Sequence, residues 1–169
     1  MLQIRCKNNN QTRNVAEGSS LLEIYNDFGV SMKYPPISAK VNNVSQGLKF
    51  RLFQNRDIEY VSIQSPSGMR VYIRSLCFVL CKAVQDIYPH SRLYIEHPIS
   101  RGFYCNFVKP AIDGRTRGLT ALEIEQVRLR MKEIISQDLP FRRHEVPTED
   151  AIALFRSHGM ADKVKLLET

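Results

Sequence analysis

The sequence predicts an α+β protein, and three observations lead to this fold class. Strand-like runs surround one short helix in residues 1–63, where turn residues separate segments of alternating polarity. The segment QSPSG at residues 64–68 interrupts both strand and helix periodicity. Helical patterns and one hairpin follow in residues 69–169. We therefore predict a first domain at 1–63, a linker at 64–68 and a second domain at 69–169.

The first domain is predicted to be a small sheet with one helix across it. Alternation at residues 2–6 and a second short strand at 13–16 indicate an N-terminal hairpin. Ser20 followed by Glu23 is a capping box that opens a helix, and Gly29 ends it. Three further strand-like runs follow: ISAKVNN (37–43), LKFRLF (48–53) and DIEYVSI (57–63).

The second domain is predicted to be an antiparallel sheet with a central helix. Residues 71–88 carry apolar side chains at helical spacing nearly all round, which favours a central helix. A hairpin is expected from SRLYIEHP and RGFYCNFV, and Thr120 with Glu123 opens a second long helix that ends near residues 138–140. The remaining expected elements are a strand at RRHEV (142–146), a short helix from Thr148 to Gly159 and a strand at KVKLLET (163–169). A last strand without a following partner suggests that this domain is incomplete at its C-terminus.

Composition narrows the class of protein. No apolar run is long enough for a membrane helix, and the first residues lack the apolar stretch of a signal peptide, so we expect a cytoplasmic protein that does not bind a membrane. In that compartment the four cysteines are expected to be free thiols. The net charge of +7 is spread over both halves and is compatible with an RNA or nucleotide partner.

The run IRSLCFVLCKAV at residues 73–84 places Cys77 and Cys81 one helical turn apart. With Cys105 or His97 from the predicted hairpin they could form a metal site, but neither CxxC nor HExxH spacing is present. We favour core packing for the two cysteines and expect no metal and no cofactor in this chain. The four histidines are scattered, which favours surface positions over a catalytic arrangement.

Phosphate contacts are the remaining chemistry to consider. The pattern GxxxxGK[ST] is absent, so the chain has no P-loop of its own. On charge alone the best candidates for anion or nucleic-acid contact are basic residues of the loop after the hairpin and of the segment after the second long helix. These candidates are Lys109, Arg115, Arg117, Arg142 and Arg143. A solvated surface is the simpler interpretation of the same residues.

Several stretches in order resemble one family. YPHSRLYIEHPISRGFYCNF, then LTALEIEQVRLRMKEIISQDLPFRRHEV and then DKVKLLE are similar to the second N-terminal domain of threonyl-tRNA synthetases, which edits mischarged serine. Residues 1–63 correspondingly resemble the TGS domain, a β-grasp module that precedes the editing domain in that family. The resemblance extends over essentially the whole chain and implies a β-grasp TGS domain followed by an editing-like domain.

The departures from the family pattern concern its catalytic residues. The family's editing domain begins with HxxxH, and here those two positions are Arg74 and Phe78. The family's YKV stretch corresponds to Asp162, Lys163 and Val164, so the site lysine is kept. Without imidazoles to transfer protons, we expect no catalytic residue in this chain. Arg74 and Lys163 join the anion-binding candidates.

The same two domains also occur in front of a P-loop kinase domain in bacterial uridine kinase-like proteins. The loss of HxxxH favours that setting, so the expected function is a non-catalytic binding or regulatory region of such a protein. ATP and Mg²⁺ would then serve only a downstream kinase domain in the same polypeptide. The alternatives are the N-terminal TGS and editing region of a threonyl-tRNA synthetase with a degenerate editing site, and a spacer without ligand. Oligomeric state is left open.

Overall fold

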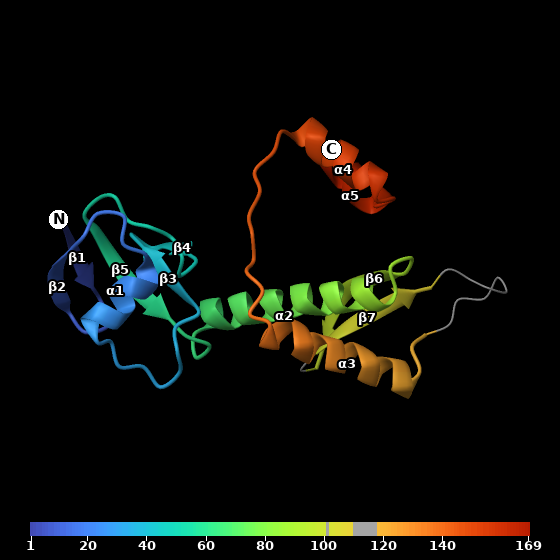
Figure 1. Cartoon of the computed structure of the whole chain (residues 1–169), viewed down its shortest axis with the longest axis horizontal. Coiled ribbons are helices and arrows are strands. Elements are labelled where there is room, and N and C mark those ends of the chain that lie inside the picture. The colour runs from blue at the N-terminus through green and yellow to red at the C-terminus, as the bar shows by residue number, and fades with distance from the viewer. Residues whose placement is uncertain (101, 110–117) are drawn as a thin grey trace. The chain divides into compact units, whose positions relative to one another are not determined.

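The computed structural model describes residues 1–100, 102–109 and 118–169, and it confirms the α+β class (Figure 1). The chain divides into two compact units, Met1–Ser136 and Gln137–Thr169. The elements of the first unit are β1 (Leu2–Cys6), β2 (Gln11–Val15), α1 (Leu21–Phe28), β3 (Ser38–Val41), β4 (Val44–Gln46), β5 (Arg56–Val61), α2 (Pro66–Ile87), β6 (Arg92–Ile99), β7 (Gly102–Val108) and α3 (Ala121–Ser136). The second unit contains α4 (Thr148–Ser157) and α5 (Ala161–Leu167).

A five-stranded sheet with the order β2-β1-β5-β3-β4 forms the N-terminal part. β1 and β5 are parallel, and the other neighbours are antiparallel. Helix α1 packs its apolar side against the sheet, where Ile4, Ile24, Phe28 and Ile58 are almost completely buried. This is the β-grasp arrangement that the resemblance implies for residues 1–63.

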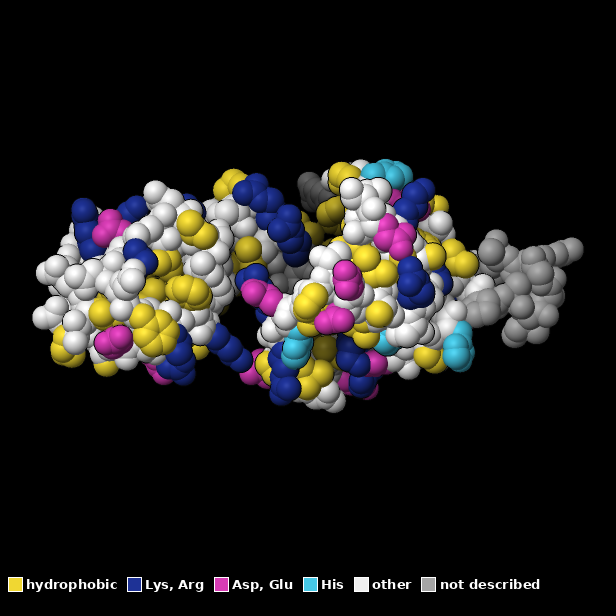
Figure 2. Space-filling view, turned by 90° about the horizontal axis from the view of Figure 1, so that it is seen from above, with side chains coloured by type: hydrophobic (Ala, Val, Ile, Leu, Met, Phe, Trp, Pro, Cys, Tyr) yellow, Lys and Arg dark blue, Asp and Glu magenta, His cyan; other side chains and the backbone are white. Residues whose placement is uncertain are grey.

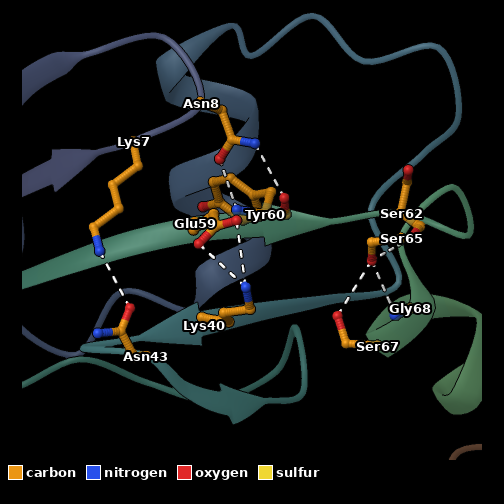
Figure 3. A network of polar contacts seen from close by, with 10 residues as sticks. All are labelled: Lys7, Asn8, Lys40, Asn43, Glu59, Tyr60, Ser62, Ser65, Ser67 and Gly68. Atoms are coloured by element: carbon orange, nitrogen blue, oxygen red, sulfur yellow. Dashed lines mark hydrogen bonds and ion pairs between the residues drawn. The ribbon is translucent and has the colours of Figure 1, made fainter.

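Polar side chains tie loops to the sheet (Figure 3). The amide of Asn8 donates to the carbonyl of Tyr60 at 3.0 Å and accepts from its backbone N–H at 2.7 Å. The Tyr60 hydroxyl donates to the carbonyl of Leu21 at 2.6 Å, and burial raises the pKa of this phenol strongly. Because each buried polar group has a partner, β5 is held in register with the first hairpin and with α1.

The caps expected from the sequence are present. Ser20 caps α1, and Glu23 returns a hydrogen bond of 2.7 Å to the Ser20 backbone. Gly29 follows in the left-handed conformation with φ 57°, which glycine adopts without steric cost. The same reciprocal pair forms between Thr120 and Glu123 at the start of α3. Both capping boxes are confirmed.

A second, smaller core lies between α2, α3 and the antiparallel hairpin β6–β7. Ala83 and Val84 of α2 pack with Val127 and Ile134 of α3, and partly buried side chains of the hairpin complete the cluster. An ion pair of 2.8 Å between Arg130 and Asp86 joins the two helices. The hairpin expected from the sequence is therefore confirmed.

The second unit is a pair of short helices. Val164 of α5 is its buried apolar residue, and Arg156 forms an ion pair of 3.0 Å with Glu168. Acidic residues occupy the first turn of α4, where they complement the helix dipole. Gly159 has φ 65° and directs the chain from α4 into α5, as a C-terminal glycine does.

The strand expected at residues 48–53 is wrong. The strand that lies between β3 and β5 in the chain is β4, at Val44–Gln46. In residues 48–53, Arg51 forms an isolated bridge with Ser20. The carbonyls of Leu48 and Phe50 accept hydrogen bonds from the first backbone N–H groups of α1, at 2.9 and 3.0 Å. The first N–H groups of a helix have no partner within the helix. Here they bond to carbonyls of residues 48–53, which a neighbouring strand would otherwise have bound.

Two other segments that were predicted to be strands, residues 142–146 and 163–169, do not form strands in the structure. RRHEV has no regular structure, and KVKLLE lies in α5 rather than in a strand. A strand needs a neighbour for its backbone groups, whereas a helix satisfies them within its own segment. Short apolar runs do not separate the two periods, because Val164 and Leu167 fit helical spacing as well as Val164 and Leu166 fit alternation.

Helix α2 is less central than its sequence predicts. Its buried residues are Gly68, Ala83 and Val84, since the second core covers mainly its C-terminal half. Large apolar side chains of the N-terminal half, such as Tyr72 and Leu76, are exposed.

Two further expectations concern membrane binding and domain limits. In the part of the chain that the structure describes, no helix combines the length and apolarity that crossing a bilayer requires. The domain limits at 63/64 and 68/69 stay a prediction; β5 ends at Val61 and α2 begins at Pro66.

Candidate functional site

The start of α2 is fixed by local chemistry. The Ser65 hydroxyl accepts a hydrogen bond of 3.1 Å from the Gly68 backbone, and Pro66 occupies the first turn, where its missing N–H costs nothing (Figure 3). Gly68 lies against the backbone of Ser62, so closely that a Cβ atom at this position would be 1.9 Å from the Ser62 carbonyl oxygen. These contacts set the direction in which the helix leaves residue 65.

Two rows of side chains then run along one side of α2. Arg70, Arg74 and Phe78 follow one another at intervals of four residues, and Ile73, Cys77 and Cys81 form the adjoining row. The rows are about 60° apart around the axis, because three residues advance by about 300°.

Side chains of both rows line one cavity of about 420 Å³. Its lining is almost wholly apolar apart from two guanidinium groups, and β7 contributes one wall through Phe103. The lining residues are Arg70, Ile73, Arg74, Cys77, Phe78, Cys81 and Phe103. A cavity of this size with few polar groups is in the range of small-molecule sites.

Arg70 and Arg74 differ from several other arginines of this protein, which are bound to carboxylates. These arginines are Arg128, Arg130 and Arg156. Within residues 1–100, 102–109 and 118–169, Arg70 and Arg74 have neither a hydrogen-bond nor an ion-pair partner. Among the residues that the structure describes, no carboxylate lines the cavity. Both charges are therefore available to an anion.

Two thiols, those of Cys77 and Cys81, line the cavity. Burial raises the pKa of the Cys105 thiol of β7, and Cys77 of α2 raises it further. Among the described residues, no group of three or more His, Cys, Asp or Glu side chains is placed to hold a metal ion. Core packing is wrong for Cys81, which is exposed, while Cys77 is half-buried. The second core includes neither cysteine and contains other side chains of α2, namely Val79, Leu80, Ala83, Val84 and Ile87.

The other predicted anion contacts are dispersed. Lys109 forms an ion pair with Glu123 and lies 4.5 Å from the centre of the Tyr88 ring, so its charge is already engaged. Arg143 pairs with Glu145 at 2.7 Å, and Lys163 lies 3.7 Å from Asp162. Arg142 is exposed. Arg115 and Arg117 lie outside the described residues.

The Lys109–Glu123 pair gives a pH-dependent expectation. The hydrogen bond from Lys109, followed by that from the Thr120 backbone, lowers the pKa of Glu123 from 4.5 to about 2. Because the folded-state pKa is the lower one, the pair stabilises the fold above pH 4.5 and this contribution is lost as pH falls toward 2. A carboxyl ¹³C NMR titration should give a midpoint near 2 for Glu123.

Replacing Lys109 by methionine should move that midpoint toward 4.5. Lys132→Met removes a lysine from the exposed surface of α3 and serves as the control, with an unchanged midpoint for Glu123. A Glu123 midpoint near 4.5 in the unaltered protein would show that Lys109 is not bound to it.

On the face of the N-terminal part that Figure 2 shows, Lys and Arg side chains are scattered among hydrophobic and uncharged ones. His90, His97, His144 and His158 are exposed, as the sequence predicted.

Sequence reasoning missed Arg70 and Phe103 as members of the site. Arg70 was available as a signal, since it lies four residues before Arg74.

Comparison with known proteins relates the whole chain to one group of enzymes. The chain is 30% identical over 155 residues to the threonine–tRNA ligase of Acidithiobacillus ferrooxidans, which covers 92% of this chain and 23% of that protein. It is 28% identical over 159 residues to that of Natranaerobius thermophilus and 26% identical over 167 residues to that of Desulforamulus reducens. The chain spans about a quarter of the length of these relatives. No protein-family model matches it.

These relatives support the resemblance to the N-terminal region of threonyl-tRNA synthetases. They contradict the expected assignment to a uridine kinase-like protein, because the matching curated proteins are threonine–tRNA ligases. The missing histidine pair was given too much weight in that assignment. Two substituted positions change the chemistry of a site without changing the fold that surrounds it.

Proposed function

We propose that this chain is the TGS and editing-like region of a threonyl-tRNA synthetase-like protein, and that it contacts tRNA without hydrolysing an aminoacyl ester. The observation that carries the proposal is the similarity to threonine–tRNA ligases along 92% of the chain. These relatives are threonine–tRNA ligases, which are enzymes that act on tRNA. Contact with tRNA also agrees with the net charge of +7.

The absence of hydrolysis follows from the side chains at the cavity. The two α2 positions at which the family has histidines are Arg74 and Phe78, and both line the cavity. A guanidinium stays protonated at neutral pH, so it cannot accept a proton from water, and a phenyl ring has no group for proton transfer. General acid–base catalysis by imidazole contributes about 10²–10⁴-fold where it operates. We therefore expect an editing-like pocket without its proton-transfer groups.

Binding of tRNA is tested by fluorescence anisotropy with a labelled tRNA at several salt concentrations. We expect measurable affinity at about 50 mM salt, and a log–log slope of about −2 or steeper, since each neutralised phosphate contributes about 0.7–0.9. The double variant Arg142→Ala/Arg143→Ala should make the slope shallower by about 1.4–1.8 if each arginine neutralises one phosphate. No binding at low salt, or binding that does not depend on salt, would contradict tRNA contact through phosphates.

Hydrolysis is tested with seryl-tRNA as substrate. Its deacylation in the presence of the chain should equal the spontaneous rate, with mild alkali as the positive control for release of serine. Deacylation by the chain above the spontaneous rate, lost in a cavity variant, would overturn the non-hydrolytic part of the proposal. It would leave tRNA contact standing.

A further inference from the structure

The cavity between α2 and β7 has chemistry that the loss of imidazoles does not explain. A site that had simply lost its function could carry any exposed residues here. Instead, the described residues place two unpaired guanidiniums and two phenyl rings around one apolar hollow, without a carboxylate in the lining. Charge, aromatic surface and cavity volume thus coincide at one place.

The two guanidiniums are spaced to act together. Arg70 and Arg74 are one helical turn apart, so their Cβ atoms are separated by about 6 Å. Both side chains are exposed and long enough to converge on one small anion. Arginine binds phosphate through paired N–H donors, and bonds of this kind are about twice as strong as neutral hydrogen bonds.

The aromatic groups indicate what accompanies the anion. Phe78 and Phe103 are 65% and 42% exposed, and they come from different elements that line the same hollow. Exposed phenyl rings offer stacking surface to a planar ring and do not distinguish one base from another. Ile73 and Cys77 complete an apolar lining that has no hydrogen-bonding group to read the edge of a base.

We propose that this cavity binds a small ligand that combines a planar ring with a phosphate, of the nucleoside monophosphate class. Arg70 and Arg74 hold the phosphate, and the ring lies against Phe78 and Phe103. The cavity volume of about 420 Å³ is within the range of sites for such ligands. The proposal goes beyond tRNA contact and does not require it, because it rests on residues of α2 and β7 alone.

Binding is measured by calorimetry with AMP as the probe, on the whole chain and without tRNA. Adenosine should bind at least about tenfold more weakly than AMP, since charge-assisted hydrogen bonds to the phosphate are lost. Arg70→Ala/Arg74→Ala should weaken AMP binding by a similar factor and leave adenosine binding unchanged. Phe78→Ala should weaken both ligands. All three positions are exposed on a helix, and alanine is a good helix former, so these variants should fold.

The control for non-specific attraction of AMP by positive charge is Lys132→Ala, which removes one positive charge from the exposed surface of α3. This variant should bind AMP as the unaltered protein does. Equal weakening by Lys132→Ala and by an arginine variant would overturn the proposal, because it would indicate general attraction of anions. So would the absence of AMP binding, if the dinucleotide ApA also fails to bind.

The dinucleotide separates the two sources of this chemistry. Binding of AMP supports a free nucleotide as the ligand, whereas binding of ApA alone supports a nucleotide within an RNA strand. A second readout is the alkylation of the cavity thiols. AMP at about ten times its Kd should slow alkylation of Cys81 about tenfold by mass action, and the arginine double variant should lose this protection. Failure here leaves the tRNA-binding and deacylation results unaffected.

Discussion

Replacing Phe28 by alanine is expected to lower the free energy of unfolding by about 3–5 kcal/mol. The ring is 1% exposed and lies in the core between α1 and the sheet. Its removal leaves a cavity that the surrounding strands cannot close, because their positions are set by backbone hydrogen bonds. The Arg13 guanidinium, 5.3 Å from the ring centre, also loses its aromatic contact.

Urea denaturation followed by circular dichroism measures this change. Phe53→Ala is the matched control, since the Phe53 side chain is 62% exposed and the variant should stay within about 0.5 kcal/mol of the unaltered protein. Equal effects of the two substitutions would mean that Phe28 is not at the centre of the core. The result reports on the β-grasp sheet, and it is independent of either proposal for the cavity.

Replacing Gly68 by alanine is expected to cost about 1–3 kcal/mol, the usual range for overpacking. The new Cβ would lie 1.9 Å from the carbonyl oxygen of Ser62 and 2.7 Å from its carbonyl carbon. Both are backbone atoms, so relief requires a shift of the chain between β5 and α2 rather than a change of rotamer. The Ser65 cap, which is bonded to the Gly68 N–H, is disturbed at the same time.

Gly47→Ala is the control for this substitution. No heavy atom lies within 4 Å of a Cβ built at Gly47, and its backbone is not left-handed. This variant should be neutral or more stable by up to about 1 kcal/mol, because alanine reduces the freedom of the unfolded chain. Thermal denaturation of the two variants side by side decides the matter. A stable Gly68→Ala protein would show that the start of α2 is not confined by Ser62.

The elements that could be predicted correctly are those with local causes. The capping boxes Ser20/Glu23 and Thr120/Glu123 each join residues three positions apart, so the sequence contains both partners. The hairpin β6–β7 likewise pairs neighbouring segments. The resemblance to threonyl-tRNA synthetases also rests on ordered short motifs, and it pointed to positions 74 and 78 without any structure.

The errors share a different cause. Residues 48–53 alternate like a strand, yet their carbonyls accept from the start of α1, a partner that no local pattern reveals. KVKLLE reads as a strand, but a strand depends on a neighbour, and this segment satisfies its backbone groups as α5. The cysteines of α2 were interpreted as core because their run is apolar, although the second core includes other apolar residues of α2 and neither cysteine.

The sequence by itself determined the capping boxes at the starts of α1 and α3, the α+β class and the replacement of two histidines, because these depend on residues close together in the chain. Only the tertiary structure decided that Arg70, Arg74 and Phe78 share one cavity with Phe103. That cavity depends on where β7 lies against α2, and packing across more than twenty residues of chain leaves no local pattern. The tertiary structure likewise decided that Arg130 binds the Asp86 carboxylate, whereas no carboxylate of the described residues lines the cavity beside Arg70 and Arg74.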